Sequence, residues 1–163
     1  MRAKRIGKWL SGSALKIHLK DESILDWLHE EGSITSRISS NAGFKLKILN
    51  DGLGMAEQEE YLAINISSQE VRIREVILYG DNKPIVYAKS IIPPLTSSEG
   101  YPGLGTIGSK PLGDLIFQSK LFISTDKSFA KFEASNGEIV WGRKINYLVK
   151  GYPFSIMEVF LLP

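Results

Sequence analysis

The stretch Phe154-Ser155-Ile156-Met157-Glu158-Val159-Phe160-Leu161-Leu162 alternates in the manner of a β-strand. Because successive side chains of a strand point to opposite faces, Glu158 shares its face with four apolar residues: Phe154, Ile156, Phe160 and Leu162. A second strand candidate, Arg72–Leu78, places Arg74 on one face with Val76 and Leu78 in the same way. A charge on an apolar strand face is costly unless it is paired or used. Three interpretations of these charges stay open at this point: a buried structural ion pair, a solvent-wetted sheet face, or a ligand site.

The composition is that of an ordinary globular protein. The chain has 163 residues, of which 43% are hydrophobic and 23% charged, so we expect one domain spanning residues 1–163, with residues 1–20 as an N-terminal arm. The net charge of +2 is too small to indicate a nucleic-acid partner and slightly favours an anionic small ligand. Without cysteine there can be no disulfide, no thiolate nucleophile and no cysteine-bound metal.

The N-terminus resembles a secretion signal only superficially. Four basic residues precede Trp9-Leu10, but Ser11-Gly12-Ser13 interrupts the apolar stretch that a signal peptide requires. No window approaches the ~20 apolar residues of a membrane-spanning helix. We therefore expect a cytoplasmic protein without stable membrane insertion, and a monomer.

Caps, turns and periodicity predict the order of the elements. Asp21 or Ser23 begins a helix that Gly32 ends, and Ser33 caps a second short helix. Among the remaining segments we expect a strand at 44–49, a loop at 50–60, a hairpin from 72–79 and 85–92, an ordered loop at 95–109, a helix start at 109–117, and strands at 121–125, 128–133, 139–149 and 154–162.

Two of these hairpins resemble each other. Arg74 lies ten residues before Pro84 and Arg143 ten before Pro153, while Lys89 and Glu158 each follow their proline by five residues. This register indicates a duplicated β-hairpin unit. The fold class that we predict is α+β: a single antiparallel sheet of about six strands, with helices packed on one side.

The motifs and residue types of the chain exclude several classes of functional site and support few. There is no phosphate-binding loop or zinc-protease motif, and the glycines of 103–108 lack the βαβ unit that a dinucleotide fingerprint needs. With only His18 and His29 and no cysteine, we expect no metal site. What remains is Arg74, which can bind a carboxylate, Glu158, which can accept a hydroxyl, and a helix start at Pro111-Leu112-Gly113 that offers free N–H groups. Together they suit a small acid that carries a hydroxyl.

The chain resembles the chorismate pyruvate-lyase family from about residue 22 to the C-terminus. The resemblance rests on seven blocks in the same order and spacing: Leu25-Asp26-Trp27-Leu28, Gly32-Ser33-Ile34-Thr35, Ile73-Arg74-Glu75-Val76-Ile77-Leu78, Ala88-Lys89-Ser90-Ile91-Ile92-Pro93, Leu104-Gly105 with Pro111-Leu112-Gly113, Trp141-Gly142-Arg143-Lys144, and Glu158-Val159-Phe160-Leu161. It implies a ligand enclosed beneath flap-like helical segments on the sheet. It also implies that chorismate is converted to 4-hydroxybenzoate and pyruvate, the entry to ubiquinone synthesis, without a cofactor.

The resemblance also implies roles for single residues. Arg74 would clamp the ring carboxylate and Glu158 would contact the ring hydroxyl, so these two are the predicted catalytic residues. The predicted substrate-binding set adds four positions, two of which act through backbone groups (Ile34 and Leu112): Ile34, Lys89, Leu112 and Gly113. Lysine replaces the family's usual arginine at Lys89 and Lys144, which keeps the charge and loses bidentate geometry.

The alternative function is a binding module. Effector-sensing domains of some bacterial transcription regulators share this fold and hold small acids without reacting. They normally follow a winged-helix domain, for which the roughly twenty residues before the first helix are too few. We therefore expect the enzyme, with chorismate and 4-hydroxybenzoate as its small-molecule partners.

Overall fold

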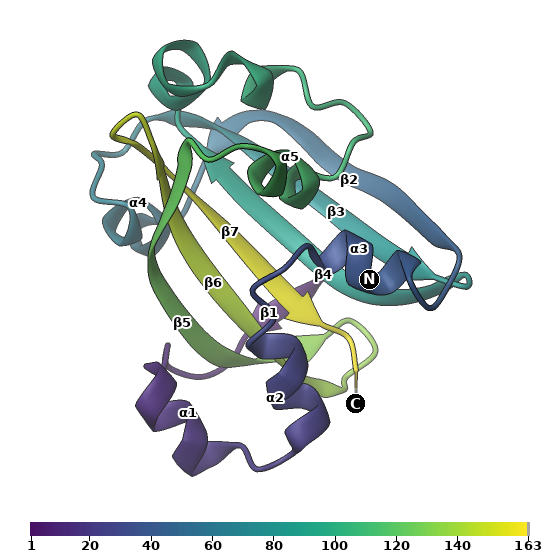
Figure 1. The fold of residues 1–163 in the computed structure, drawn as a ribbon. Helices are drawn as coiled ribbons and strands as arrows, with labels where there is room; N and C mark the ends of the chain where they lie inside the picture. Colours follow the sequence, from purple (N-terminus) through teal and green to yellow (C-terminus); the bar gives the residue numbers. More distant parts are fainter. Residues whose placement is uncertain (163) are drawn as a thin grey trace.

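The computed structural model describes residues 1–162, and this part of the chain forms one curled antiparallel sheet of seven strands (Figure 1). This confirms the predicted α+β fold around a single antiparallel sheet. In their order across the sheet the strands are β1 (Ala3–Arg5), β5 (Phe122–Ala134), β6 (Ile139–Val149), β7 (Tyr152–Phe160), β4 (Lys83–Ile92), β3 (Glu70–Gly80) and β2 (Phe44–Met55).

The duplication is visible in the strand order. Strands β2, β3 and β4 form one three-stranded meander, and β5, β6 and β7 form another. The two meanders join at the antiparallel pairing of β4 with β7, where Ala88 lies opposite Glu158. The repeated unit is therefore a hairpin with one further strand, and its two copies meet at the centre of the sheet.

One face of the sheet, here called the inner face, carries Val76, Leu78, Ala88 and Phe160. Three helices pack on it: α1 (Gly12–His18), α2 (Glu22–Leu28) and α3 (Ile34–Ser39). They contribute buried apolar residues to one core, among them Leu15, Leu28 and Ile38. Further along the same face lie the short helical turns Thr96–Gly100 and Pro102–Gly105 and the helix α5 (Leu112–Gln118), which pack on Phe154 and Ile156.

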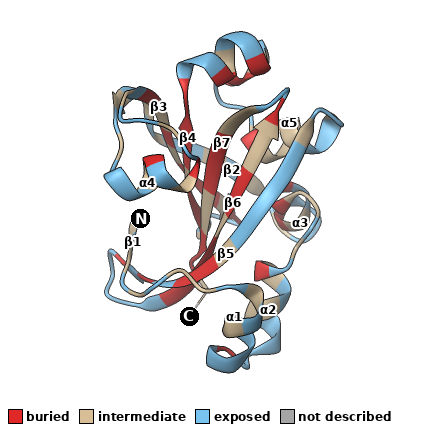
Figure 2. Cartoon of the chain, turned by 90° about the vertical axis from the view of Figure 1, so that its left-hand side faces the viewer, coloured by how far each residue is buried: buried red, intermediate tan, exposed pale blue. Residues whose placement is uncertain are grey.

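The opposite, outer face is covered by less material. The N-terminal arm packs Trp9 against Phe132 there, and α4 (Gln58–Ala63) packs Tyr61 against Val71. The sequence did not indicate that α4 lies on the side away from the other helices. Figure 2 shows the central strands β4, β7 and β6 largely buried, whereas the first half of β5 is exposed.

Two predicted boundaries were wrong. Strand β2 continues through the predicted loop at 50–60 as far as Met55, because pairing with β3 outweighs the poor strand propensity of its glycines. The two strands predicted at 121–125 and 128–133 are one strand, β5, with an irregular register between Ser124 and Asp126. Such a β-bulge inserts an extra residue and re-aims the side chains that follow it.

Two further differences are smaller: the helix predicted to end at Gly32 ends at Leu28, and the predicted N-terminal arm contains β1 and α1. The predicted loop at 95–109 is ordered and contains the two short helical turns, and α5 begins one residue after Pro111, which is its N-cap. Within residues 1–162, no helix combines the length and the apolar character that crossing a membrane requires.

Candidate active site

A cavity of about 520 Å³ lies between the inner face and the starts of α3 and α5. The centre of its floor is formed by β3, β4 and β7, β5 and β6 form one side, and the two helix starts form its cover. Of the six predicted site residues it brings together five: Ile34, Arg74, Leu112, Gly113 and Glu158. These come from four separate elements, so the cavity exists only in the folded chain.

Arg74 is held rigidly at one end of the cavity and is only 2% exposed. Its Nη1 donates to Asp51 Oδ2 at 3.1 Å and to the carbonyl of Gly108 at 2.7 Å, and its Nη2 donates to the carbonyl of Lys110 at 2.8 Å. Three of its five N–H groups are thus used, which leaves one on Nε and one on Nη2 for a ligand. Burial lowers the pKa of Arg74, and Asp51 partly offsets this shift.

The charge at this end of the cavity is unbalanced in favour of an anion. Arg72 also binds Asp51, with Nε to Oδ1 at 2.7 Å and Nη2 to Oδ2 at 2.9 Å. Hydrogen bonding to Arg72, together with the charges of both arginines, holds the pKa of Asp51 below its usual range. Two guanidinium groups therefore share one carboxylate, and the remaining positive charge favours a ligand carboxylate beside Arg74.

The glycine-rich segment 103–108 supports these arginines. The carbonyl of Gly105 accepts from Arg72 at 2.8 Å, as that of Gly108 does from Arg74. Gly108 has a φ of 60°, a left-handed conformation that glycine adopts without strain. The segment thus contributes backbone acceptors to two arginines, which is a structural role.

Glu158 lies in the same cavity but pairs with a residue that the sequence had not placed in the site. Arg143, 3% exposed, donates from Nε to Glu158 Oε1 at 2.9 Å. The Nη1 of Arg143 donates to the carbonyls of Leu28 at 3.0 Å and Glu30 at 2.6 Å, at the end of α2. Among the described residues Glu158 Oε2 has no hydrogen-bond partner, so it is free to accept one from a ligand.

The starts of α3 and α5 meet above the cavity. The first N–H groups of a helix have no intrahelical partner, and those of Ile34 and Leu112 belong to first turns. The two starts are joined by a hydrogen bond of 2.7 Å from Ser33 Oγ to Asp114 Oδ1. The same hydroxyl caps α3 by accepting from the backbone N–H of Ser36 at 3.1 Å. Ser33 therefore fixes both helix starts relative to each other.

Replacing Ser33 with alanine should loosen this cover. The loss of the N-cap alone is expected to lower the free energy of unfolding by about 1 kcal/mol. For a chain of this size that corresponds to a melting temperature lower by roughly 2–4 °C, measured by circular dichroism. Ser33→Thr retains a capping hydroxyl and is the matched control. An unchanged melting temperature for Ser33→Ala would contradict this role.

Lys89, the sixth predicted residue, is not in this cavity. Its side chain is on the outer face, where Nζ lies 3.0 Å from Glu60 Oε2. The cause is an irregular register between Leu78 and Tyr79, which shifts the pairing of β3 with β4 by one residue. Because a one-residue shift reverses the face of every later side chain, Lys89 does not occupy the position in its hairpin that Glu158 occupies in the other.

Tyr147 adds a polar group to the cavity wall. Its ring stacks on Phe154 with centroids 5.2 Å apart, and burial, with the charge of Glu158 as a smaller cause, raises the pKa of Tyr147 to about 12. The phenol therefore stays protonated at neutral pH and can donate a hydrogen bond. Within residues 1–162, no three histidine, cysteine or acidic side chains are grouped as metal ligands.

Comparison with known proteins identifies the family. Residues 6–163 match the model of the family described as "Chorismate lyase". The chain belongs to the chorismate lyase family. It is 32% identical over 163 residues to a protein of Pseudomonas putida named "Probable chorismate pyruvate-lyase", which covers 94% of this chain and 87% of that protein. A protein of Pectobacterium atrosepticum named "Chorismate pyruvate-lyase" is 28% identical over 145 residues, covering 86% of this chain and 77% of that protein.

Solved structures place this member of the chorismate lyase family in a wider fold group. A transcriptional regulator of the GntR family from Enterococcus faecalis aligns with a TM-score of 0.54 at 10% identity, over 76% of this chain and 93% of that chain. The C-terminal domain of the histidine utilization repressor from Pseudomonas syringae pv. tomato aligns with a TM-score of 0.56 at 11% identity, over 72% of this chain and 91% of that chain. At these identities the likeness shows the fold alone.

Proposed function

We propose that this protein is a carbon–oxygen lyase that converts chorismate to 4-hydroxybenzoate and pyruvate. Membership of the chorismate lyase family supports the reaction class. The observation that carries the assignment to this site is that Arg74 and Glu158, both largely buried, line one cavity. Arg74 offers N–H groups to a carboxylate and Glu158 offers a free oxygen to a hydroxyl. A ring that bears both groups satisfies both residues at once.

The roles of the residues follow from the substrate. In the reaction the bond between the ring carbon and the enolpyruvyl oxygen breaks, and its electron pair leaves with the oxygen. The neighbouring ring carbon loses its hydrogen as a proton, the C–H electron pair forms the new ring double bond, and the departing enolpyruvate gains a proton to become pyruvate. The ring becomes aromatic, so atoms and electrons balance without an oxidant. Arg74 orients the ring carboxylate, Glu158 Oε2 accepts the ring hydroxyl, and the N–H groups at Ile34 and Leu112 bind ligand oxygens. Holding the reactive conformer and stabilising the departing oxygen are the main tasks of the site.

The cavity is well suited to these tasks because its polar groups are fixed in advance. The guanidinium of Arg74 is fixed by three hydrogen bonds and that of Arg143 by three more, so little reorganisation is needed when the substrate enters. Gly113 leaves space beside Leu112, since a Cβ there would have no neighbour within 4 Å. We further propose that the enzyme is a cytoplasmic monomer and that its benzoate product enters ubiquinone synthesis.

A direct assay tests this function. Purified protein is mixed with chorismate, 4-hydroxybenzoate is measured by chromatography, and pyruvate is measured with lactate dehydrogenase. Both products should appear in equal amounts, above a control without protein that corrects for spontaneous decay. Binding of chorismate with no product would refute the lyase and support the effector-sensing alternative.

A further inference from the structure

Chorismate carries two carboxylates, and the groups described so far account for only one of them. Arg74 takes the carboxylate on the ring. Among the described residues Arg143 has Glu158 to itself as a counter-charge, whereas Arg74 shares Asp51 with Arg72, and Lys89 lies on the outer face. A second cation for the enolpyruvyl carboxylate is therefore needed. Lys127, on β5, lines the same cavity.

The register of the sheet places Lys127 across the cavity from Arg74. Lys127 lies opposite Ile145, Ile145 opposite Ile156, Ile156 opposite Ser90, and Ser90 opposite Arg74. Residues paired in this way share one face, so these five side chains form a row across five strands on the inner face. Four strand spacings of ~4.8 Å put the backbones of Arg74 and Lys127 roughly 19 Å apart. The distance between their charged groups is shorter, because both side chains are long and the sheet is curled.

The bulge in β5 is what brings Lys127 to this face. Ser124 pairs with Tyr147 and Lys127 with Ile145, so both line the cavity although they are three residues apart. In a regular strand, residues three apart point to opposite faces. The extra residue between Ser124 and Asp126 therefore turns the lysine towards the cavity, at the rim where β5 is exposed.

The ammonium of Lys127 is available to a ligand. No hydrogen bond or ion pair involving its Nζ joins it to another of residues 1–162. The charged groups that act on it are Arg143, Glu31 and Glu158, and the pKa of Lys127 is lowered, first by burial and then by Arg143. A partly desolvated ammonium beside a guanidinium gains from an anion placed between them.

We propose that Lys127 binds the enolpyruvyl carboxylate of chorismate and so makes the site selective for a dianion over its monoanionic product. The inference rests on the proposed function. In this arrangement the two carboxylates of the substrate occupy opposite ends of the row, Arg74 at one end and Lys127 at the other. The product keeps only the carboxylate at Arg74, so it makes no contact that depends on Lys127.

The test compares Lys127→Met with the unaltered protein. Turnover kinetics with chorismate are measured beside calorimetric binding of 4-hydroxybenzoate. The variant should lose about tenfold to a hundredfold in kcat/KM, as expected for one charge-assisted hydrogen bond, mainly through a higher KM. Its affinity for 4-hydroxybenzoate should change by less than about twofold, since the product lacks the second carboxylate. Lys127→Arg should recover most of the loss.

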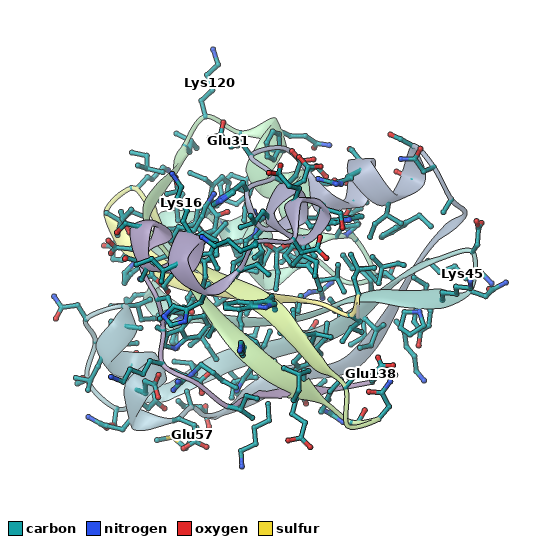
Figure 3. All side chains as sticks on the ribbon, turned by 90° about the horizontal axis from the view of Figure 1, so that it is seen from below. Lys16, Glu31, Lys45, Glu57, Lys120 and Glu138 are labelled. Carbon is teal, nitrogen blue, oxygen red and sulfur yellow. The ribbon has the colours of Figure 1, made fainter. Side chains whose placement is uncertain are left out.

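Lys120→Met is the matched control, because it removes the same charge from a side chain that points away from the protein body (Figure 3) and does not line the cavity. Its kinetics should match those of the unaltered protein. Equal weakening of substrate and product in Lys127→Met, or unchanged substrate kinetics, would overturn the inference. If the unaltered protein makes no product, the proposed reaction fails. The role of Lys127 is then decided by binding alone: Lys127→Met should weaken the binding of chorismate and leave that of 4-hydroxybenzoate nearly unchanged.

Discussion

Arg74→Ala is expected to lower kcat/KM for chorismate by roughly 30-fold to several thousandfold. This corresponds to about 2–5 kcal/mol, the range for truncating one partner of a buried, hydrogen-bonded charge pair. Unlike Lys127→Met, the change should weaken 4-hydroxybenzoate binding by a similar factor, because the product keeps the carboxylate that Arg74 binds. Steady-state kinetics measure kcat/KM for chorismate, and calorimetry measures the affinity for 4-hydroxybenzoate.

Folding must be separated from binding in this variant. Arg74 also donates to the carbonyls of Gly108 and Lys110, so its loss releases the segment that precedes α5. Arg74→Lys keeps the charge with less geometric fit and should have intermediate activity. Thermal melting of each variant shows how much protein is folded at the assay temperature. A folded Arg74→Ala protein with near-normal turnover would refute the assignment of Arg74.

Arg143→Met is expected to lower the free energy of unfolding by about 3–5 kcal/mol, more than Ser33→Ala or Arg2→Met. The substitution leaves Glu158, whose side chain is 14% exposed, without its partner charge, and leaves the carbonyls of Leu28 and Glu30 without a donor. Chemical denaturation measures the change. Activity should fall as well, because Arg143 fixes the position of Glu158.

Two controls isolate the buried pair. Arg143→Met combined with Glu158→Gln removes both charges and should regain part of the lost stability, since no unpaired charge remains. Arg2→Met removes a guanidinium from an exposed pair, in which Arg2 lies 3.4 Å from Glu75 and is 57% exposed, and should cost no more than about 1 kcal/mol. A single Arg143 variant as stable as the Arg2 variant would contradict the structural role of the pair.

The sequence drew attention to two residues that line the cavity, Arg74 and Glu158, because they break a pattern. Arg74 and Glu158 each interrupt an apolar alternation, and period-two geometry assigns each of them to the apolar face of its own strand. That the two faces are one face of a single sheet came only from the strand pairing. The same signal was present at Arg143, which shares its strand face with Trp141 and Ile145, yet neither the hairpin repeat nor the family block at 141–144 gave it a role in the site. Its pairing with Glu158 depends on which strands are neighbours, and this became clear only from the register of β6 with β7.

The two lysines show where local pattern is insufficient. A bulge between Leu78 and Tyr79 turns Lys89 to the outer face, and another between Ser124 and Asp126 turns Lys127 to the inner face. Bulges depend on how two strands pair, so they cannot be predicted from the sequence of either strand alone. Lys127 also fell between two segments that were predicted as separate strands. One lysine was therefore predicted for a cavity that it does not line, and the other, which does line the cavity, was overlooked.

A crystal structure of the protein with 4-hydroxybenzoate tests the central claim most directly. We expect the benzoate carboxylate within hydrogen-bonding distance of Arg74 and the phenol at Glu158 Oε2, with the ring between the inner face and the starts of α3 and α5. A benzoate bound on the outer face of the sheet, or in this cavity with neither Arg74 nor Glu158 in contact, would contradict the account.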